Sequence, residues 1–248
     1  MSKDIYNTYL GKAYRFMDFN GFQQTILKSE LRFSRIDTFN DPLDCSPYLS
    51  FKNWWEPFDN NYKLIHSIKN SFFRRFIEPS YVCCFCQEYD TDNSFLMWSH
   101  YAKNHSGVCF EIDFEKTKFM GGPSKVTYSQ NIQKDRQKIS QKTSEERGLF
   151  LATTKIKQWS YEKEVRLIVD LESPSLNSKM RLEENKMYLY YPFDLSLISK
   201  IIFGVNASEN DTSGIISLLN SKQITPKYEK IIINPNTVQM ETINYDDY

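Results

Sequence analysis

The segment at residues 159–169 constrains the fold of this chain more than any other part of the sequence. It reads Trp-Ser-Tyr-Glu-Lys-Glu-Val-Arg-Leu-Ile-Val, and its β-branched end predicts a strand. Because side chains alternate between the two faces of a strand, we expect Glu162, Glu164 and Arg166 to share one face. Two carboxylates and a guanidinium on one wall indicate either an active site or a solvated strand face on which Arg166 offsets Glu164.

The chain has enough apolar residues to bury a sizeable core. Of its 248 residues, 40% are hydrophobic and 15% are aromatic, and the sequence contains neither repeats nor a low-complexity linker. Short helical and strand patterns alternate along it. We therefore predict one compact α+β domain over residues 1–248, with a mixed, mainly antiparallel sheet and flanking helices.

The charge balance and the N-terminus argue against several classes of protein. Lysine plus arginine and aspartate plus glutamate number 31 each, so no bulk field exists to hold a polyanion and bulk nucleic-acid binding is not expected. No apolar run is long enough to cross a bilayer, and residues 1–4 lack the hydrophobic segment of a secretory signal, which predicts a cytoplasmic protein without membrane contact. The cysteines and histidines lack zinc-site spacing, so we expect reduced thiols and no metal.

Hydrophobic periodicity and turn formers place the individual elements. The residues after Asn234 are rich in Asn and Asp, so we expect the tail to be ordered only in part. The predicted helices lie at residues 21–29, 58–77, 92–107, 130–148 and 212–219. The predicted strands lie at residues 12–16, 31–34, 81–86, 107–112, 125–128, 162–169, 187–191, 198–203 and 228–233.

Two further segments are candidates for ligand contact. Residues 96–101 read Leu-Met-Trp-Ser-His-Tyr, and a short helix that carries Trp98, His100 and Tyr101 offers few purely apolar faces to a core. These amphipathic rings favour a ligand-facing wall over the alternative of a hydrogen-bonded boundary helix. The loop at residues 37–44 contains several turn formers and Pro42, and we expect it to be stiff.

The order of these motifs resembles a family of bacterial and phage proteins of unknown function. The matching words are Tyr14-Arg15, Phe-Asn-Asp-Pro at residues 39–42, the 96–101 segment, Gly-Val-Cys at 107–109 and the 159–166 segment. The resemblance covers about residues 12–205, which leaves 206–248 as a C-terminal strand and tail. Val165 stands where the family usually has Trp, and Leu43 where Phe is common.

An early arginine, a central aromatic element and a late Glu-x-Glu strand also follow the order seen in ADP-ribosyltransferases. This resemblance implies an ADP-ribosyltransferase-like fold with NAD as substrate, and it leaves open whether the acceptor is a protein, a nucleic acid or a small molecule. It makes Glu164 the residue that stabilises the positive charge built up as nicotinamide leaves, and Glu162 the residue that orients or deprotonates the acceptor. Genes for such proteins often lie near mobile elements, which implies a role as toxin or in phage defence.

The same resemblance assigns roles to the other motif residues. Arg15 would grip the phosphates or ribose of the dinucleotide through its planar guanidinium. Trp98 or Tyr101 would stack on nicotinamide, and Ser99 or His100 would position the ribose, with His100 grouped with the two glutamates as catalytic. The remaining residues expected at the cofactor are Tyr14, Ser34, Asn40, Asp41 and Arg166.

Two other functions remain open from the sequence. The first is a metal-dependent nuclease or phosphodiesterase, for which magnesium ligands would come from the acidic residues Asp41, Asp44, Glu111, Asp113, Glu162 and Glu164. The second is a nucleotide-binding module without catalysis, which Arg15 and the aromatic helix would serve equally well.

Overall fold

The structure is a computed structural model that describes residues 8–41, 43–45, 80–90, 94–116, 119, 122–131, 134–135, 143–171 and 180–245. Contacts within the chain divide it into two compact units. The first unit contains residues 1–9, 32–83 and 119–190, and the second contains residues 10–31, 84–118 and 191–248. Boundaries between the units fall inside strands β2 (Glu30–Arg35), β3 (Ser80–Cys86) and β10 (Tyr188–Pro192), so these three strands contribute to both units.

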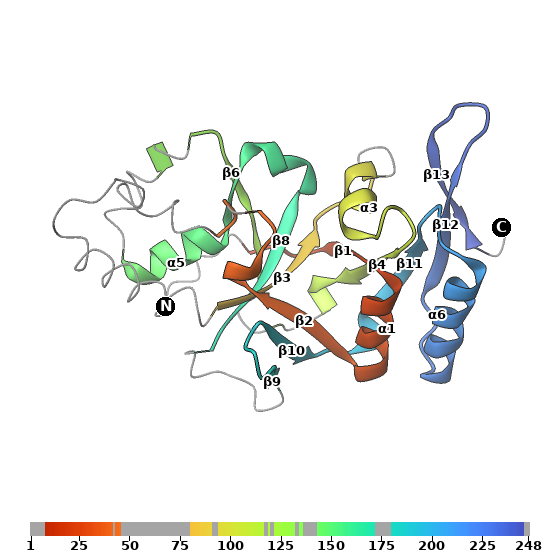
Figure 1. Ribbon diagram of the computed structural model, residues 1–248, viewed down its shortest axis with the longest axis horizontal. Helices are drawn as coiled ribbons and strands as arrows, with labels where there is room; N and C mark the ends of the chain where they lie inside the picture. Colours follow the sequence, from red (N-terminus) through yellow and green to blue (C-terminus); the bar gives the residue numbers. More distant parts are fainter. Residues whose placement is uncertain are drawn as a thin grey trace. The chain divides into compact units, whose positions relative to one another are not determined.

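A mainly antiparallel sheet organises the second unit (Figure 1). Its strands follow the order β13 (Met240–Asn244), β12 (Lys227–Ile233), β11 (Ile198–Phe203), β4 (Val108–Asp113) and β1 (Lys12–Met17). Neighbouring strands run antiparallel except β11 and β12, which are parallel and are joined through helix α6 (Glu209–Ser221). A parallel pair needs such a crossover connection because a tight turn reverses the chain direction.

Helix α1 (Phe19–Lys28) packs on the face of this sheet that carries Phe110 and Phe203. The ring of Phe22 stacks on Phe110 at 5.2 Å between centroids, and Phe19 stacks on Phe203 at 6.1 Å. Side chains alternate between the two faces along β4, which places Phe110 on the α1 face and its neighbours Cys109 and Glu111 on the other. Burial of these large rings removes apolar surface from water and stabilises the second unit.

The opposite face of the sheet carries helix α3 (Phe95–Tyr101). Trp98 is fully buried and meets Phe16 of β1 edge to face, with the ring centroids 5.1 Å apart. The ring of Tyr89 lies 5.8 Å from that of Tyr14 and 6.3 Å from that of Phe16. The aromatic helix predicted from the sequence is therefore partly a core element, since Trp98 belongs to this aromatic group.

Three successive left-handed residues end α3 earlier than the sequence predicts. Lys103, Asn104 and His105 have φ values of 48°, 54° and 64°, a conformation that costs free energy in residues with a Cβ atom. Backbone contacts from two glycines hold this turn in place. The amide of Gly204 donates to the carbonyl of Gly107 at 3.0 Å, and a Cβ atom at either glycine would overlap a backbone oxygen.

The first unit is built from short paired strands. Strand β5 (Pro123–Lys125) pairs antiparallel with β8 (Glu164–Asp170), and β6 (Thr127–Ser129) pairs parallel with β7 (Thr154–Ile156). Strand β2 (Glu30–Arg35) pairs with β3, and β9 (Arg181–Leu182) pairs with β10 (Tyr188–Pro192). Helix α5 (Ser144–Ala152) leads into β7, and the 3-10 helix η6 (Lys157–Glu162) leads into β8.

These observations confirm an α+β fold with mainly antiparallel pairing, whereas the ADP-ribosyltransferase-like architecture and the single-domain organisation stay predictions. Among the described residues, no helix is long and apolar enough to cross a membrane. The helix predicted at 58–77 lies outside the described residues. The strand expected at 125–128 is divided between β5 and β6. Within the segment expected as a helix at 130–148, the helical residues that the structure describes are 134–135 and the start of α5. Within the tail after Asn234, β13 pairs with β12 over five residues, whereas residues 246–248 lie outside the described residues, so the expectation of a partly ordered tail stays a prediction.

Gly107→Ala and Gly204→Ala should each lower the free energy of unfolding of the second unit by about 1–3 kcal/mol, the usual cost of overpacking. A Cβ atom would lie 2.3 Å from the Met17 carbonyl oxygen at position 107 and 2.2 Å from that of His105 at position 204. Gly214→Ala is the control, because position 214 lies inside α6 with no atom within 4 Å. Alanine there should stabilise the protein by up to about 1 kcal/mol. Urea unfolding of the three variants tests this, and equal effects would contradict it.

Candidate functional site

The acidic segment around Glu164 is buried rather than solvated. Glu164 and Arg166 are 4% and 0% exposed and alternate onto the same face of β8, as the sequence predicts. Glu162 departs from the prediction, because it ends η6 and not the strand. Lys163 lies between Glu162 and Glu164 in a left-handed conformation with φ of 42°, and this conformation breaks the alternation of side chains along the strand. Glu162 nevertheless turns inward and is 3% exposed.

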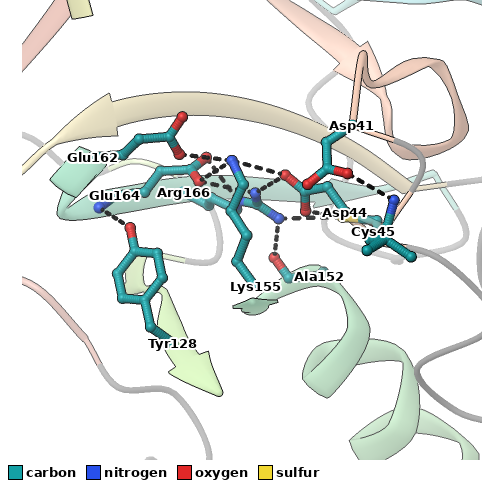
Figure 2. Close-up of polar contacts among 10 residues, drawn as sticks. Asp41, Asp44, Cys45, Tyr128, Ala152, Lys155, Glu162, Glu164 and Arg166 are labelled. Atoms are coloured by element: carbon teal, nitrogen blue, oxygen red, sulfur yellow. Dashed lines mark hydrogen bonds and ion pairs between the residues drawn. The ribbon is translucent and has the colours of Figure 1, made fainter. Parts of the chain in front are cut away.

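Arg166 donates all five of its guanidinium N–H groups to protein atoms (Figure 2). Nε and Nη2 bind the two carboxylate oxygens of Glu164 at 2.8 and 2.9 Å. Nη2 also binds Asp44 Oδ2 at 2.6 Å, and Nη1 binds the Ala152 carbonyl at 3.0 Å and Cys45 Sγ at 3.2 Å. The paired bonds to Glu164 fix the plane of its carboxylate as well as its position.

Lys155 of β7 is the second buried cation of the cluster. Its Nζ lies 2.6 Å from Glu162 Oε2, 3.2 Å from Asp44 Oδ2 and 3.5 Å from Glu164 Oε2, and 4.8 Å from the centroid of the Trp159 ring. Three carboxylates thus surround one ammonium group. We call these five residues, Asp44, Lys155, Glu162, Glu164 and Arg166, the charge cluster.

The surroundings of the cluster shift the pKa values of Asp44, Lys155 and the neighbouring Cys45. Burial alone would raise the pKa of Asp44, but Arg166 and then Lys155 outweigh it, so the pKa of Asp44 is lowered. Burial alone would lower the pKa of Lys155, but Glu164, Asp44 and Glu162 raise it well above its ordinary value. Burial raises the pKa of the Cys45 thiol far above its ordinary range, so Cys45 serves as a hydrogen-bond partner and not as a reactive thiolate.

The arrangement disfavours a metal site at these carboxylates. The Lys155 ammonium occupies the position among Asp44, Glu162 and Glu164 that a cation would take. Within the described ranges, no group of three or more His, Cys, Asp or Glu side chains is placed to hold a metal ion. Glu111, another ligand considered for magnesium, belongs to the second unit, where Lys12, Tyr14 and Ser199 bind its carboxylate.

The predicted site residues of the first unit gather around the cluster in part. The ring of Phe39 lies 5.3 Å from the Arg166 guanidinium carbon, so the loop before Asp44 borders the cluster. Asn40 is exposed and Asp41 is half-buried in this loop. Ser34 is half-buried in β2, where it pairs with Val82 of β3.

The predicted site residues of the second unit do not all share one face. Tyr14 lies on the face that carries Trp98, and its hydroxyl donates to Glu111 Oε2 at 2.8 Å. Arg15 points to the opposite face, where its guanidinium lies 5.6 Å from the centroid of the Phe85 ring.

Helix α3 presents its polar residues with different exposures. His100 is exposed, whereas Ser99 and Tyr101 are half-buried. Nε1 of Trp98 has no hydrogen-bond partner among the described residues. The prediction that Arg15 and His100 share a cleft with Glu164 concerns residues of different units, and it stays a prediction.

Sequence reasoning missed Lys155, Cys45 and Tyr128, and it considered Asp44 only as a metal ligand. The Tyr128 hydroxyl accepts a bond from the backbone N–H of Glu164 at 2.8 Å and thereby fixes the start of β8. A signal for Lys155 did exist, because it lies between Thr154 and Ile156 in a β-branched run, where a buried lysine requires an acidic partner. Its partners are distant in sequence and could not be identified from spacing.

The comparison with known families gives one match. Residues 97–167 match the model of a family described as a protein of unknown function, DUF2971. The match confirms, over these residues, the resemblance to an uncharacterised family that the motifs indicate. It includes most of α3 and the part of the charge cluster formed by β7, η6 and the start of β8. Searches of the curated proteins and of the solved structures gave no match.

Arg166→Met should lower the free energy of unfolding by about 3–5 kcal/mol, because it leaves buried carboxylates without their main cationic partner. The matched control is Lys12→Met, which removes a lysine that also pairs with a buried glutamate but whose side chain is 61% exposed. The control should cost much less, since solvent screens exposed pairs. Denaturant unfolding measures both, and a cost for Arg166→Met as small as that of the control would contradict a stabilising cluster.

Acid should destabilise the first unit through Asp44. Its pKa is lowered on folding from the ordinary value of 3.8, so the folded protein binds fewer protons than the unfolded chain. The resulting stability is complete above about pH 4 and is lost as the pH falls through the folded-state pKa. Urea unfolding midpoints followed with decreasing pH measure this loss. Asp44→Asn should flatten the acid limb of the profile, and an unchanged limb in that variant would assign it to other carboxylates.

Proposed function

We propose that the protein binds NAD and transfers its ADP-ribose group, with Glu164 at the reacting centre. In such a transfer the bond between nicotinamide and ribose breaks, and nicotinamide leaves as a neutral molecule. The acceptor nucleophile then forms a bond to the ribose carbon that carried nicotinamide. Positive charge builds on the ribose in the transition state. A fixed carboxylate stabilises that charge, because it needs no reorganisation as the charge develops.

One observation carries this proposal: Arg166 holds both oxygens of Glu164 in a buried site. A carboxylate that acts by electrostatic stabilisation has to be held in a fixed orientation, and a paired guanidinium supplies that orientation. A carboxylate oxygen accepts more than one hydrogen bond, so pairing with Arg166 is compatible with a ribose contact.

Asp44, Lys155 and Arg166 then act as positioning residues for the two glutamates. Lys155 holds Glu162 at 2.6 Å, two residues from Glu164, where Glu162 would orient or deprotonate the acceptor. Because all five N–H groups of Arg166 already have protein acceptors, Arg166 acts on the ligand through Glu164 and Asp44.

Under this proposal, the motif residues of the second unit differ in how accessible they are to a ligand. Half-buried Tyr101 is better placed to stack on nicotinamide than Trp98, whose ring is fully enclosed. The exposed His100 is proposed to position the ribose or the acceptor. Arg15 is proposed to bind phosphate, although it lies on the face of the sheet opposite to α3. The role of a toxin or phage-defence enzyme is proposed by resemblance alone.

Glu164→Gln should abolish turnover while NAD binding is kept. The amide keeps the size of the side chain but removes the negative charge that the transition state requires. The measurement is nicotinamide released from NAD by the purified protein, which should fall by about a hundredfold or more. NAD binding, followed by the ligand-dependent rise in melting temperature, should remain.

The matched control is Glu229→Gln in the second unit. Glu229 is also buried and ion-paired, to Lys200 and Lys227, but lies outside the charge cluster. The folded Glu229→Gln variant should release nicotinamide from NAD as fast as the wild type. Full turnover in Glu164→Gln would remove Glu164 from the mechanism, and NAD binding without nicotinamide release by the wild type would make the protein a binding module.

A further inference from the structure

Two buried polar atoms beside the charge cluster have no hydrogen-bond partner among the described residues. They are Oγ of Ser124 and Oδ2 of Asp41. A buried polar atom left without a partner costs about 1–3 kcal/mol, so folded proteins contain few of them. Such atoms are explained when a bound ligand supplies the missing bond.

Ser124 faces the cluster from the neighbouring strand. It lies directly opposite Arg166 in the antiparallel pair of β5 and β8, and its residue is 2% exposed. Side chains of directly opposed residues lie on the same face of a sheet, with Cβ atoms about 5 Å apart. The Ser124 hydroxyl is therefore on the face of β8 that carries Arg166 and Glu164.

Asp41 approaches the same cluster from the loop. Its Oδ1 accepts from the backbone N–H of Leu43 at 2.9 Å, and its carbonyl accepts from the backbone N–H of Asp44 at 3.1 Å. Asp44 in turn binds Arg166 and Lys155. Figure 2 draws Asp41 next to Asp44 at this end of the cluster. The turn thus fixes one carboxylate oxygen of Asp41 and leaves the other buried without a donor.

The chemistry of these atoms specifies the ligand group. Asp41 Oδ2 needs a hydrogen-bond donor, and the Ser124 hydroxyl both donates and accepts. Several carboxylates surround the position, and the guanidinium N–H groups of Arg166 are all used within the protein, so a phosphate would meet like charges and no free guanidinium donor there. A neutral group with hydroxyl donors fits this environment.

We propose that Asp41 and Ser124 bind the hydroxyl groups of a ribose ring next to Glu164. This assignment rests on the proposed function and names the part of the dinucleotide that the first unit holds. Asp41 Oδ2 accepts from one ribose hydroxyl, and Ser124 completes the contact with the ring hydroxyls. The ribose carbon that reacts is thereby held near the carboxylate of Glu164.

Asp41→Asn and Ser124→Ala test the assignment in the full chain. ADP-ribose is the probe, because it carries the ribose hydroxyls and cannot release nicotinamide. Each substitution should weaken ADP-ribose binding in titration calorimetry by about tenfold or more, as expected for a lost hydrogen bond to a buried group. Neither should lower the melting temperature of the protein without ligand, since each removes a group that lacks a partner.

Asp37→Asn is the control, because Asp37 is paired with Arg35 at the surface of the first unit. This substitution should leave the affinity for ADP-ribose unchanged. Unchanged affinity in both test variants, or no binding of ADP-ribose to the wild type, would overturn the ribose assignment. Nicotinamide release from NAD is measured in parallel and reports on the proposed function separately. If nicotinamide is released and both variants bind ADP-ribose as tightly as the wild type, the proposed transferase activity is kept and the ribose site is rejected. If both variants bind ADP-ribose more weakly but nicotinamide is not released, the ribose site is kept and the transferase activity is rejected.

Discussion

The pairing of Arg166 with Glu164, Asp44, Cys45 and the Ala152 carbonyl is the interaction on which the first unit depends. A fully buried guanidinium loses its hydration, and the loss is offset only when all its donors find acceptors at good geometry. Arg166 meets this condition by joining a loop, the end of α5 and strand β8. Loss of any one partner would leave a buried charge or donor unsatisfied, so these segments are held to one arrangement.

The same constraint makes the cluster suited to chemistry. Its charges are fixed before a ligand binds, which is the condition for strong electrostatic stabilisation of a transition state. Lys155 and Arg166 hold the carboxylates of the cluster through ion pairs within the protein. Under the proposed function, the ligand contacts are therefore made by Glu162, Glu164, Asp41 and Ser124. In the second unit the sheet buries Trp98 and directs Tyr14 and Arg15 to opposite faces, which assigns them to different surroundings.

Much of the fold could be predicted from local patterns, because most strands bury alternating or continuous apolar residues. The segment at 159–169 was correctly predicted to bring Glu164 and Arg166 to one face. The position of Glu162 could not be predicted, since the left-handed conformation of Lys163 is set by the end of η6 and not by a glycine in the sequence. The early end of α3 was missed for the same reason, because left-handed residues at 103–105 depend on contacts from Gly204, which is about a hundred residues away. Lys155 was missed because its partners come together only in the folded chain.

A double-mutant cycle between Glu164 and Arg166 tests most directly whether these two residues act as one unit. The free energies of unfolding of Glu164→Gln, Arg166→Met and the double variant are compared with that of the wild type. A coupled buried pair predicts that the double variant is more stable than the sum of the single losses implies, by about 1–3 kcal/mol. Losses that add within about 0.5 kcal/mol would contradict the account, because they would mean that Arg166 does not hold the carboxylate of Glu164.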